Sequence, residues 1–268
     1  MLRTEEPGVL LAQITDTHIT RNGPEARYLG EIIAWINALR PLPDAVLLSG
    51  DAVDNGRPEQ YAALRALLAR CESAVYVVPG NHDARAALRD GLPASYFPGA
   101  AGTRVDYCVD VGAIRAIGLD TAEQRRPGGI LPPLTLDWLD AALAAAPVRP
   151  TLIFMHHPPF RTGVNAADMF GFSGLGRFRE IVARYPAVRR IIAGHIHCER
   201  QAAVGNALAS TSLSSIPQRV PELFERRRVL HFRPEPAGFA THEWRDGAFV
   251  STTYVNAGDG RFIERVAG

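Results

Sequence analysis

Five short apolar runs in this chain each end in polar residues that can bind a metal ion. The stretches that close the runs are Asp16-Thr17-His18, Gly50-Asp51, Gly80-Asn81-His82-Asp83, His156-His157 and Gly194-His195-Ile196-His197. An apolar run of this length that ends in a turn is typical of a buried strand in an α/β protein. Because ligands bind outside the carboxyl ends of the strands in such sheets, we expect the five stretches to build one site.

Helical spacing separates the first three runs. Residues 28–39 and 58–70 each place apolar side chains on one helical face, and Pro41 ends the first helix. This alternation of strands and helices with short turns predicts an α/β fold. Residues 105–111 and 113–119, on either side of Gly112, predict a hairpin, so we expect a mixed sheet. Two further helices are predicted at 134–145 and 175–185, and two loops at 123–133 and 158–176.

After residue 198 the helical pattern fades and short strand candidates follow, at 207–210, 228–232, 238–244 and 248–254. We expect residues 1–268 to form a single domain, in which 1–198 carries all the polar stretches and 199–268 forms a second sheet. The segment 217–243 looks too irregular for core strands. Its apolar residues (Leu223, Phe224, Phe232 and Phe239) predict an oligomer contact or a lid over a neighbour's site. The alternative is that this segment packs on its own sheet.

Composition excludes several classes of protein. A chain of 268 residues with 47% hydrophobic residues can bury a core without disulfides. The net charge of +1 gives no global attraction to nucleic acid or to a membrane surface. Three widely spaced cysteines predict neither a disulfide framework nor a cysteine zinc site. We find no signal-peptide pattern and no run near the ~18 apolar residues of a membrane helix, so we expect a cytoplasmic protein.

The polar stretches contain six of the eight histidines, together with Asp16, Asp51 and Asn81. Oxygen and nitrogen ligands without thiolate favour Zn, Mn, Fe or Co. Taken singly, each residue could have a structural role, since aspartates cap helices, asparagines form turns and buried histidines accept hydrogen bonds. Such roles do not account for five strand ends together. The set therefore predicts a site for two metal ions.

The five stretches, in this order, resemble the motif series of the calcineurin-like metallophosphoesterases. The resemblance covers residues 16–197. Within that superfamily, Pro79-Gly80-Asn81-His82-Asp83 and Met155-His156-His157-Pro158-Pro159 are most similar to the bacterial class III cyclic nucleotide phosphodiesterases and the related glycerophosphodiesterases. The resemblance implies an α/β fold with four layers, an αββα sandwich of two mixed β-sheets flanked by helices.

The resemblance also implies a role for each motif residue. One metal ion would be bound by Asp16, His18, Asp51 and His197, and the other by Asp51, Asn81, His156 and His195. Asp51 would bridge the two ions, and a hydroxide between them would attack phosphorus. The catalytic residues would be His82, which contacts the phosphate and stabilises or protonates the leaving oxygen, and Asp83, which orients His82.

The function that follows is hydrolysis of small phosphodiesters, such as 3′,5′-cyclic AMP or glycerophosphodiesters, by a homo-oligomer. The Gly50-to-Gly56 block and Pro79 differ from the pattern of protein Ser/Thr phosphatases. One alternative is a phosphomonoesterase or nucleotidase of the same superfamily. Another is a non-catalytic interaction module, in which some of the metal-binding residues would be expected to be replaced. We expect no nucleic acid polymer and no membrane as partner.

Substrate specificity is expected in the loops around the metal ions. Asn81, His82 and Arg161 are candidate substrate-binding residues; Asn165 and Phe170 lie on the same loop as Arg161, and residues 21–27 form a second candidate loop. We expect His157 to support the site without binding metal. Cys198 should point away from the site, because side chains alternate along an extended chain.

Overall fold

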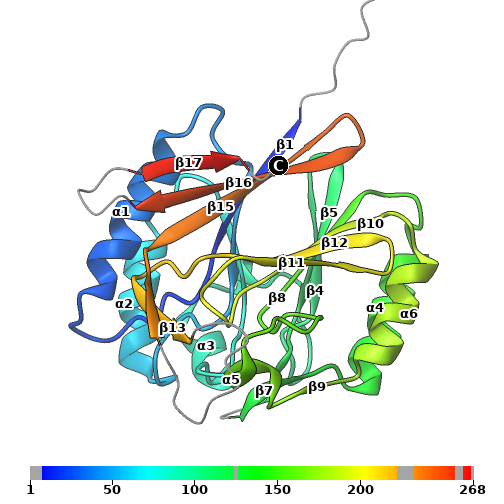
Figure 1. Ribbon diagram of the computed structural model, residues 1–268, viewed down its shortest axis with the longest axis horizontal. Coiled ribbons are helices and arrows are strands. Elements are labelled where there is room, and N and C mark those ends of the chain that lie inside the picture. The colour runs from blue at the N-terminus through cyan, green and yellow to red at the C-terminus, as the bar shows by residue number, and fades with distance from the viewer. Residues whose placement is uncertain (1–7, 124–125, 222–231, 257–261, 267–268) are drawn as a thin grey trace, which may run out of the picture.

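Two six-stranded sheets face each other, and helices cover the outer face of each, so the fold is the expected four-layer αββα sandwich (Figure 1). The computed structural model describes residues 8–123, 126–221, 232–256 and 262–266. The first sheet has the order β17-β16-β15-β1-β2-β3 and the second has the order β11-β12-β10-β8-β5-β4. Both sheets are mixed, as predicted.

The first sheet joins strands from the two ends of the chain. Its members are β1 (Val9–Ile14), β2 (Ala45–Ser49), β3 (Ala74–Val78), β15 (Gly238–Arg245), β16 (Ala248–Asn256) and β17 (Phe262–Val266). The strands β1, β2 and β3 are parallel, so their carboxyl ends lie at one edge. The strands β15, β16 and β17 form an antiparallel meander, and β15 pairs with β1.

The second sheet comes from the middle of the chain. Its members are β4 (Tyr107–Val111), β5 (Ile114–Leu119), β8 (Thr151–Met155), β10 (Val188–Ala193), β11 (Arg200–Val204) and β12 (Ala207–Thr211). The strands β5, β8, β10 and β12 are parallel, and β4 and β11 are antiparallel edges. The predicted hairpin around Gly112 is confirmed as the pair β4 and β5.

The prediction that residues 199–268 form the second sheet is wrong. Only β11 and β12 join it, whereas β15, β16 and β17 extend the sheet of β1, β2 and β3. The reason is geometric. After β12 the chain crosses to the free edge of β1, where the register pairs Val9 with Trp244 and Gln13 with Ala240. Local hydrophobic patterns predict strands, but they do not say which edge a strand will join.

Helices pack on the outer faces as their apolar spacing predicts. They are α1 (Glu25–Ala38), α2 (Pro58–Leu68), α3 (Arg85–Gly91), α4 (Pro133–Ala144), α5 (Asn165–Asp168) and α6 (Leu175–Arg184), with a 3-10 turn at Ala94–Tyr96. In Figure 1, α1 and α2 cover one sheet and α4 and α6 cover the other. Alternate residues of β8 divide between the two cores. Leu152 and Phe154 face the first sheet, and Ile153 and Met155 face the helices.

The two segments predicted as loops contain short regular elements. They are β6 (Ala122–Glu123), β7 (Arg126–Ile130) and β9 (Phe172–Ser173), which form a three-stranded sheet, together with α5. The backbone N–H of Gly129 donates to the carbonyl of Gly171 at 3.1 Å. Strands this short and rich in glycine and proline carry no periodic signal, so the sequence could not predict them.

The expectation that segment 217–243 is too irregular for core strands is also wrong in part. Phe239 of β15 is fully buried and stacks on Tyr254 of β16, with 4.6 Å between ring centroids. Two further strands, β13 (Gln218–Pro221) and β14 (Phe232–Glu235), pair with each other. Leu223 and Phe224 lie outside the described residues.

Candidate metal centre

The carboxyl ends of five parallel strands bring the predicted ligands together. Asp16, Asp51 and Asn81 follow β1, β2 and β3 of one sheet, and His156 and His195 follow β8 and β10 of the other. The site therefore spans the seam between the two sheets. Backbone hydrogen bonds join the loops, since the N–H groups of Asp16 and His18 donate to the carbonyls of Gly50 and Asp51, both at 3.0 Å.

The first group of donors consists of Asp16, His18 and His197. The Nε2 atoms of His18 and His197 are 3.3 Å apart, and Nε2 of His197 is also 3.3 Å from Oδ1 of Asp16. Asp16 is fully buried, and its carboxylate accepts the N–H of His195 and the hydroxyl of Thr15. Thr15 is a supporting residue that the motif pattern does not reveal.

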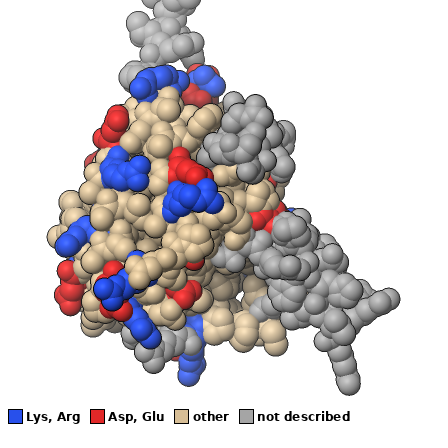
Figure 2. All heavy atoms as spheres, turned by 90° about the vertical axis from the view of Figure 1, so that its left-hand side faces the viewer, with Lys and Arg blue, Asp and Glu red and all other residues tan. Residues whose placement is uncertain are grey.

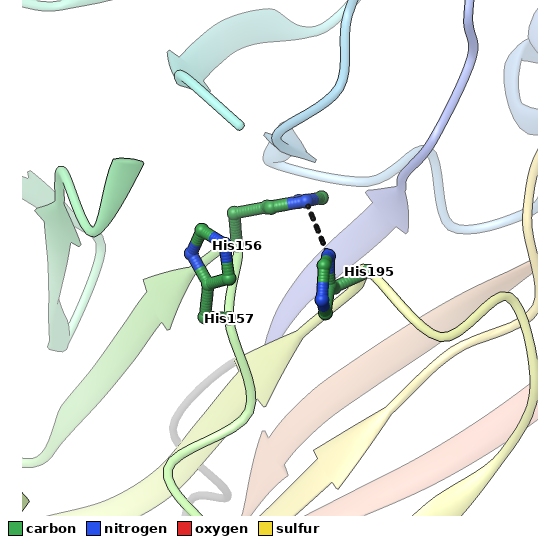
Figure 3. A group of neighbouring side chains, drawn as sticks. All are labelled: His156, His157 and His195. Carbon is green, nitrogen blue, oxygen red and sulfur yellow. Dashed lines mark hydrogen bonds between the residues drawn. The ribbon is translucent and has the colours of Figure 1, made fainter. Parts of the chain in front are cut away.

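The second group consists of Asp51, Asn81, His156 and His195. Nε2 of His156 lies 3.3 Å from Oδ2 of Asp51 and 3.2 Å from both Oδ1 of Asn81 and Nδ1 of His195. Figure 3 shows the rings of His156 and His195 directed toward each other. Oδ2 of Asp51 is also 3.8 Å from Nε2 of His18, so Asp51 lies between the two groups.

These spacings fit metal coordination. With bonds of about 2.0–2.2 Å, neighbouring nitrogen and oxygen ligands of one ion lie roughly 3–3.5 Å apart. The donor pairs whose distances are given above, two in the first group and three in the second, have this separation. In addition, Nδ1 of His156 lies 3.1 Å from the carbonyl of Ser49, which can only accept a hydrogen bond. Nε2 of His156 is then the ring nitrogen that can bind a metal once it loses its proton; a hydrogen bond at the other ring nitrogen usually orients a ligand histidine in this way.

The pKa values of the buried histidines and aspartates are shifted by burial and by their charged neighbours. Burial alone would lower the pKa of His156, but the charge of Asp51 raises this pKa to about 9. Burial alone would raise the pKa of Asp16, whereas His197 lowers it to about 2. For His195, burial and the nearby His156 lower the pKa to about 3. Positive charge is thus favoured beside Asp16 and Asp51, where metal ions can supply it, whereas the His195 ring is neutral.

The backbone around the donors is strained. Asp16, His18, Asp51, His195 and His197 have φ angles of 51°, 42°, 47°, 74° and 55°. Among the described non-glycine residues, the only other positive φ is that of Asp246, in a hairpin turn. Such conformations cost of order 1–3 kcal/mol each and are found mainly where function requires them. Gly194 is needed because a Cβ there would overlap Oγ1 of Thr15 and Oδ2 of Asp16.

His82 lies beside the donors, with 41% of its side chain exposed. Its Nδ1 atom donates to the carbonyl of Asp54 at 2.7 Å, and its Nε2 atom is 3.9 Å from Oδ2 of Asp51. The expectation that Asp83 orients the His82 ring is therefore wrong. The His82 ring is instead held by the backbone carbonyl of Asp54.

Asp83 instead holds the loop backbone in place. Its buried carboxylate accepts the N–H groups of Gly80, Ala52 and Val53 at 2.8, 3.1 and 3.3 Å, and the hydroxyl of Tyr61 at 2.9 Å. These bonds tie the loop after β3 to the loop after β2. Asp83 consequently positions Asn81 and Asp51 through the backbone, without contacting the reacting atoms.

Two cavities flank the donors. One, of about 440 Å³, is lined by Asp54, Asn81 and His82, and the other, of about 100 Å³, is lined by His195, His157 and Arg161. Pro127 of β7 borders both. Arg161 thus lies beside the site as predicted. Phe170 is 52% exposed. The other candidate loop, 21–27, is a loop only in part, because α1 begins at Glu25; Arg27 lies in this helix and pairs with Glu31 at 2.6 Å.

His157 and Cys198 lie next to donors in the sequence. Nδ1 of His157 lies 2.9 Å from Oγ1 of Thr121, and Oγ1 in turn accepts the N–H of His157. Burial, together with His195 and His156, holds the pKa of His157 well below its usual value, so this ring is neutral. Cys198 is buried in an apolar cluster with Val164 and Ile196.

The comparison with protein families supports this geometry. Residues 9–199 match the family model of the calcineurin-like phosphoesterases. The chain belongs to this family, which uses a dinuclear metal centre. Together with its phosphodiesterase relatives, the match confirms the predicted enzyme class of metal-dependent phosphoric diester hydrolase.

Several curated proteins are similar over most of this chain. A glycerophosphodiester phosphodiesterase of Enterobacter lignolyticus is 32% identical over 85% of both chains. A 3′,5′-cyclic-nucleotide phosphodiesterase of Nostoc is 32% identical over 73% of this chain and 74% of the relative. The 3′,5′-cyclic adenosine monophosphate phosphodiesterase of Escherichia coli is 30% identical over 72% of this chain and 71% of the relative.

Solved structures confirm the fold. A dimetal phosphatase from Danio rerio superposes with a TM-score of 0.73 at 16% identity, covering 98% of this chain and all of that one. A purple acid phosphatase from yellow lupin gives a TM-score of 0.70 at 14% identity and covers 97% of this chain and 53% of that one. In the described part of the chain, no helix has the length and apolar character needed to cross a membrane.

Proposed function

We propose that this protein hydrolyses small phosphodiesters at a centre of two metal ions. The proposed ligands are Asp16, His18, Asp51 and His197 for one ion and Asp51, Asn81, His156 and His195 for the other. The observation that supports this most is the convergence of these donors from five strand ends, at separations that suit coordination. The proposed ions are drawn from Mn, Fe, Zn and Co, since the donors are nitrogen and oxygen atoms.

The two cavities favour a diester over a monoester. A phosphodiester carries two ester groups, and in-line displacement sends the leaving group away from the attacking oxygen. The larger cavity beside His82 can receive one group and the smaller cavity beside His195 the other. Arg161, on the smaller cavity, would bind a polar or anionic part of the substrate.

The residues of the chain have distinct tasks in this proposal. When bound, the two ions would polarise the phosphate oxygens and activate a water molecule for attack. Asn81 and His82 would hold the phosphate, and the bond from Nδ1 of His82 to the carbonyl of Asp54 directs Nε2 toward it. In its protonated form, Nε2 can donate a proton to the leaving oxygen.

A substrate panel tests the proposal on metal-loaded protein. We expect cleavage of bis-p-nitrophenyl phosphate and of cyclic AMP or a glycerophosphodiester at least 10-fold faster, in kcat/KM, than cleavage of p-nitrophenyl phosphate. His82→Ala should lower kcat by about 100-fold or more and leave metal content unchanged. Asn81→Ala should lower both kcat and the metal content. Good cleavage of monoesters with no cleavage of any diester would overturn the proposal and support the phosphomonoesterase or nucleotidase alternative.

Quaternary structure and location form the second part of the proposal. We propose a homo-oligomer, a dimer or larger, that acts in the cytoplasm on a small-molecule substrate and not on a nucleic acid polymer. On the face seen in Figure 2, basic and acidic side chains are interspersed, and the described residues show no continuous basic band there. Sedimentation of the full chain tests the oligomeric state, and a monomer at micromolar concentration would contradict it.

A further inference from the structure

The space between the two sheets is apolar along only part of its length. Where β2 and β3 face β5 and β8, it is filled by the main core. Where β1, β15 and β16 face β10, β11 and β12, most of the lining side chains are polar, and they border an open cavity of about 510 Å³. None of the proposed metal ligands lines this cavity, so it is separate from the candidate metal centre.

Arg190 of β10 is the most buried charge on the cavity wall. Its side chain points between the sheets like that of Ile192, and the residue is 5% exposed. One terminal nitrogen donates to Oγ of Ser210 at 2.8 Å, whereas the buried Nε atom has no partner. In the parts of the chain that the structure describes, no carboxylate lies within ion-pair distance of this guanidinium. Burial lowers the pKa of Arg190 to about 10, so it remains charged at neutral pH.

The other ionisable groups on the wall do not neutralise this charge. The carboxylate of Glu199 accepts the hydroxyl of Thr253. Arg200 adds a second guanidinium, and one of its terminal nitrogens is buried without a partner. Two arginines therefore face one glutamate, and the wall carries a net positive charge. A buried charge left without a partner is unfavourable, so an anion in the cavity would stabilise the fold.

His242 cannot serve as an acid here. Its Nε2 atom donates to Oε1 of Gln13 at 3.0 Å, and its Nδ1 atom accepts the hydroxyl of Ser251 at 2.8 Å. The direction of these bonds follows from Gln13, whose amide nitrogen donates to Oγ of Ser49 and to the carbonyl of Ala193. Burial, and then the charge of Arg190, hold the pKa of His242 well below its usual value. This histidine is a neutral donor and acceptor.

We propose that this inter-sheet cavity binds a small organic anion through its phosphate or carboxylate group, with Arg190 and Arg200 as counter-charges. Guanidinium groups present a planar fork that matches such oxyanions. The hydroxyl of Ser210, which accepts a hydrogen bond from Arg190, would be a further polar contact for the anion. The cavity volume falls within the range of small-molecule sites, so the rest of the ligand has room.

Calorimetric titration of the metal-loaded protein tests the proposal. Inorganic phosphate and succinate serve as separate probes of the two oxyanion types. Because phosphate also binds at metal centres, we expect two phosphate sites in the natural protein and one in Arg190→Met, if the anion is a phosphate. If it is a carboxylate, succinate should bind at one site and bind at least 10-fold more weakly to Arg190→Met. The inhibition constant of phosphate against diester cleavage should not change, since it reports the metal centre.

A matched control is Arg189→Met, which removes the exposed arginine next to Arg190 on the same strand and should change nothing. If Arg190→Met does not fold, Arg200→Met and Ser210→Ala test the same cavity and should each weaken binding at least fivefold. The proposal is overturned if neither probe binds outside the metal centre. It is also overturned if the variants bind as the natural protein does, since Arg190 would then be structural.

Discussion

His195 and His197 are two residues apart in the chain, yet they face different neighbours. His195 contacts His156, and His197 contacts His18 and Asp16. Both residues have a positive φ, and the turn between them directs one ring to each group of donors. The Gly-His-Ile-His stretch is thus the point at which the two proposed ion sites are held in register.

Replacing either histidine should therefore remove a different ion. We expect His195→Ala and His197→Ala each to reduce the metal content from two ions to one per chain. Each should also lower kcat/KM by about 100-fold or more, because both ions act on the phosphate. Elemental analysis and anomalous scattering measure which position empties. Cys198→Ala is the matched control and should retain both ions; loss of both ions in each histidine variant would contradict separate sites.

Metal binding should depend on pH through His156. Its pKa of about 9 in the metal-free protein means that an ion must displace a proton at pH 7. The apparent affinity should rise up to about 10-fold per pH unit from pH 7 toward 9 and then level off. Calorimetry with Mn²⁺ in buffers of different ionisation enthalpy would detect the released proton. A constant affinity between pH 7 and 9, or an equal slope in His156→Gln, would count against this assignment.

At the scale of elements, strand pairing decided which sheet each strand joins, which the local hydrophobic pattern could not predict. The strands β15 and β16 were predicted close to their observed bounds, but they were assigned to the wrong sheet. Phe239 shows the consequence, because pairing of β15 with β1 turns this side chain into the core. The short sheet of β6, β7 and β9 brings Pro127 between the two cavities of the candidate site.

The position of β15 leads to a stability prediction. Phe239→Ala should lower the free energy of unfolding by about 3–5 kcal/mol, because it removes a fully buried ring and leaves a cavity. Urea unfolding followed by circular dichroism measures the change. Val250→Ala on β16, a residue that is 43% exposed, should change it by less than about 0.5 kcal/mol. Equal, small effects of the two changes would mean that β15 is not a core strand.

At the scale of the whole molecule, the candidate metal centre and the arginine-lined cavity both lie between the two sheets. The candidate metal centre lies at the carboxyl edge of the seam between them, and the arginine-lined cavity lies along one side of it. Asp16 is fully buried and Asp51 nearly so, and in the protein alone the neighbouring histidine rings offset their negative charge. Metal ions should stabilise the fold as well as support the reaction.

Removal of the metal ions should lower the melting temperature. Two ions at 100 times their dissociation constants contribute about 5 kcal/mol in total, which corresponds to a shift of roughly 10–20 °C for a domain of this size. Differential scanning calorimetry before and after chelation measures the shift. Adding Mn²⁺ back should restore the transition. In the His197→Ala variant the shift should be about half as large, and an undiminished shift would indicate binding elsewhere.

The sequence by itself determined the α/β layers, the candidate ligand residues and their order, because periodicity predicts the strands and helices, and the polar residues that end five strands follow the motif order of the family. It also predicted the separate tasks of His195 and His197 through the family resemblance. Only the tertiary structure decided which sheet the C-terminal strands join, that Asp54 and not Asp83 fixes His82, and that Arg190 is buried without a counter-charge. These properties depend on pairing and on contacts between residues distant in the chain, which local periodicity does not encode.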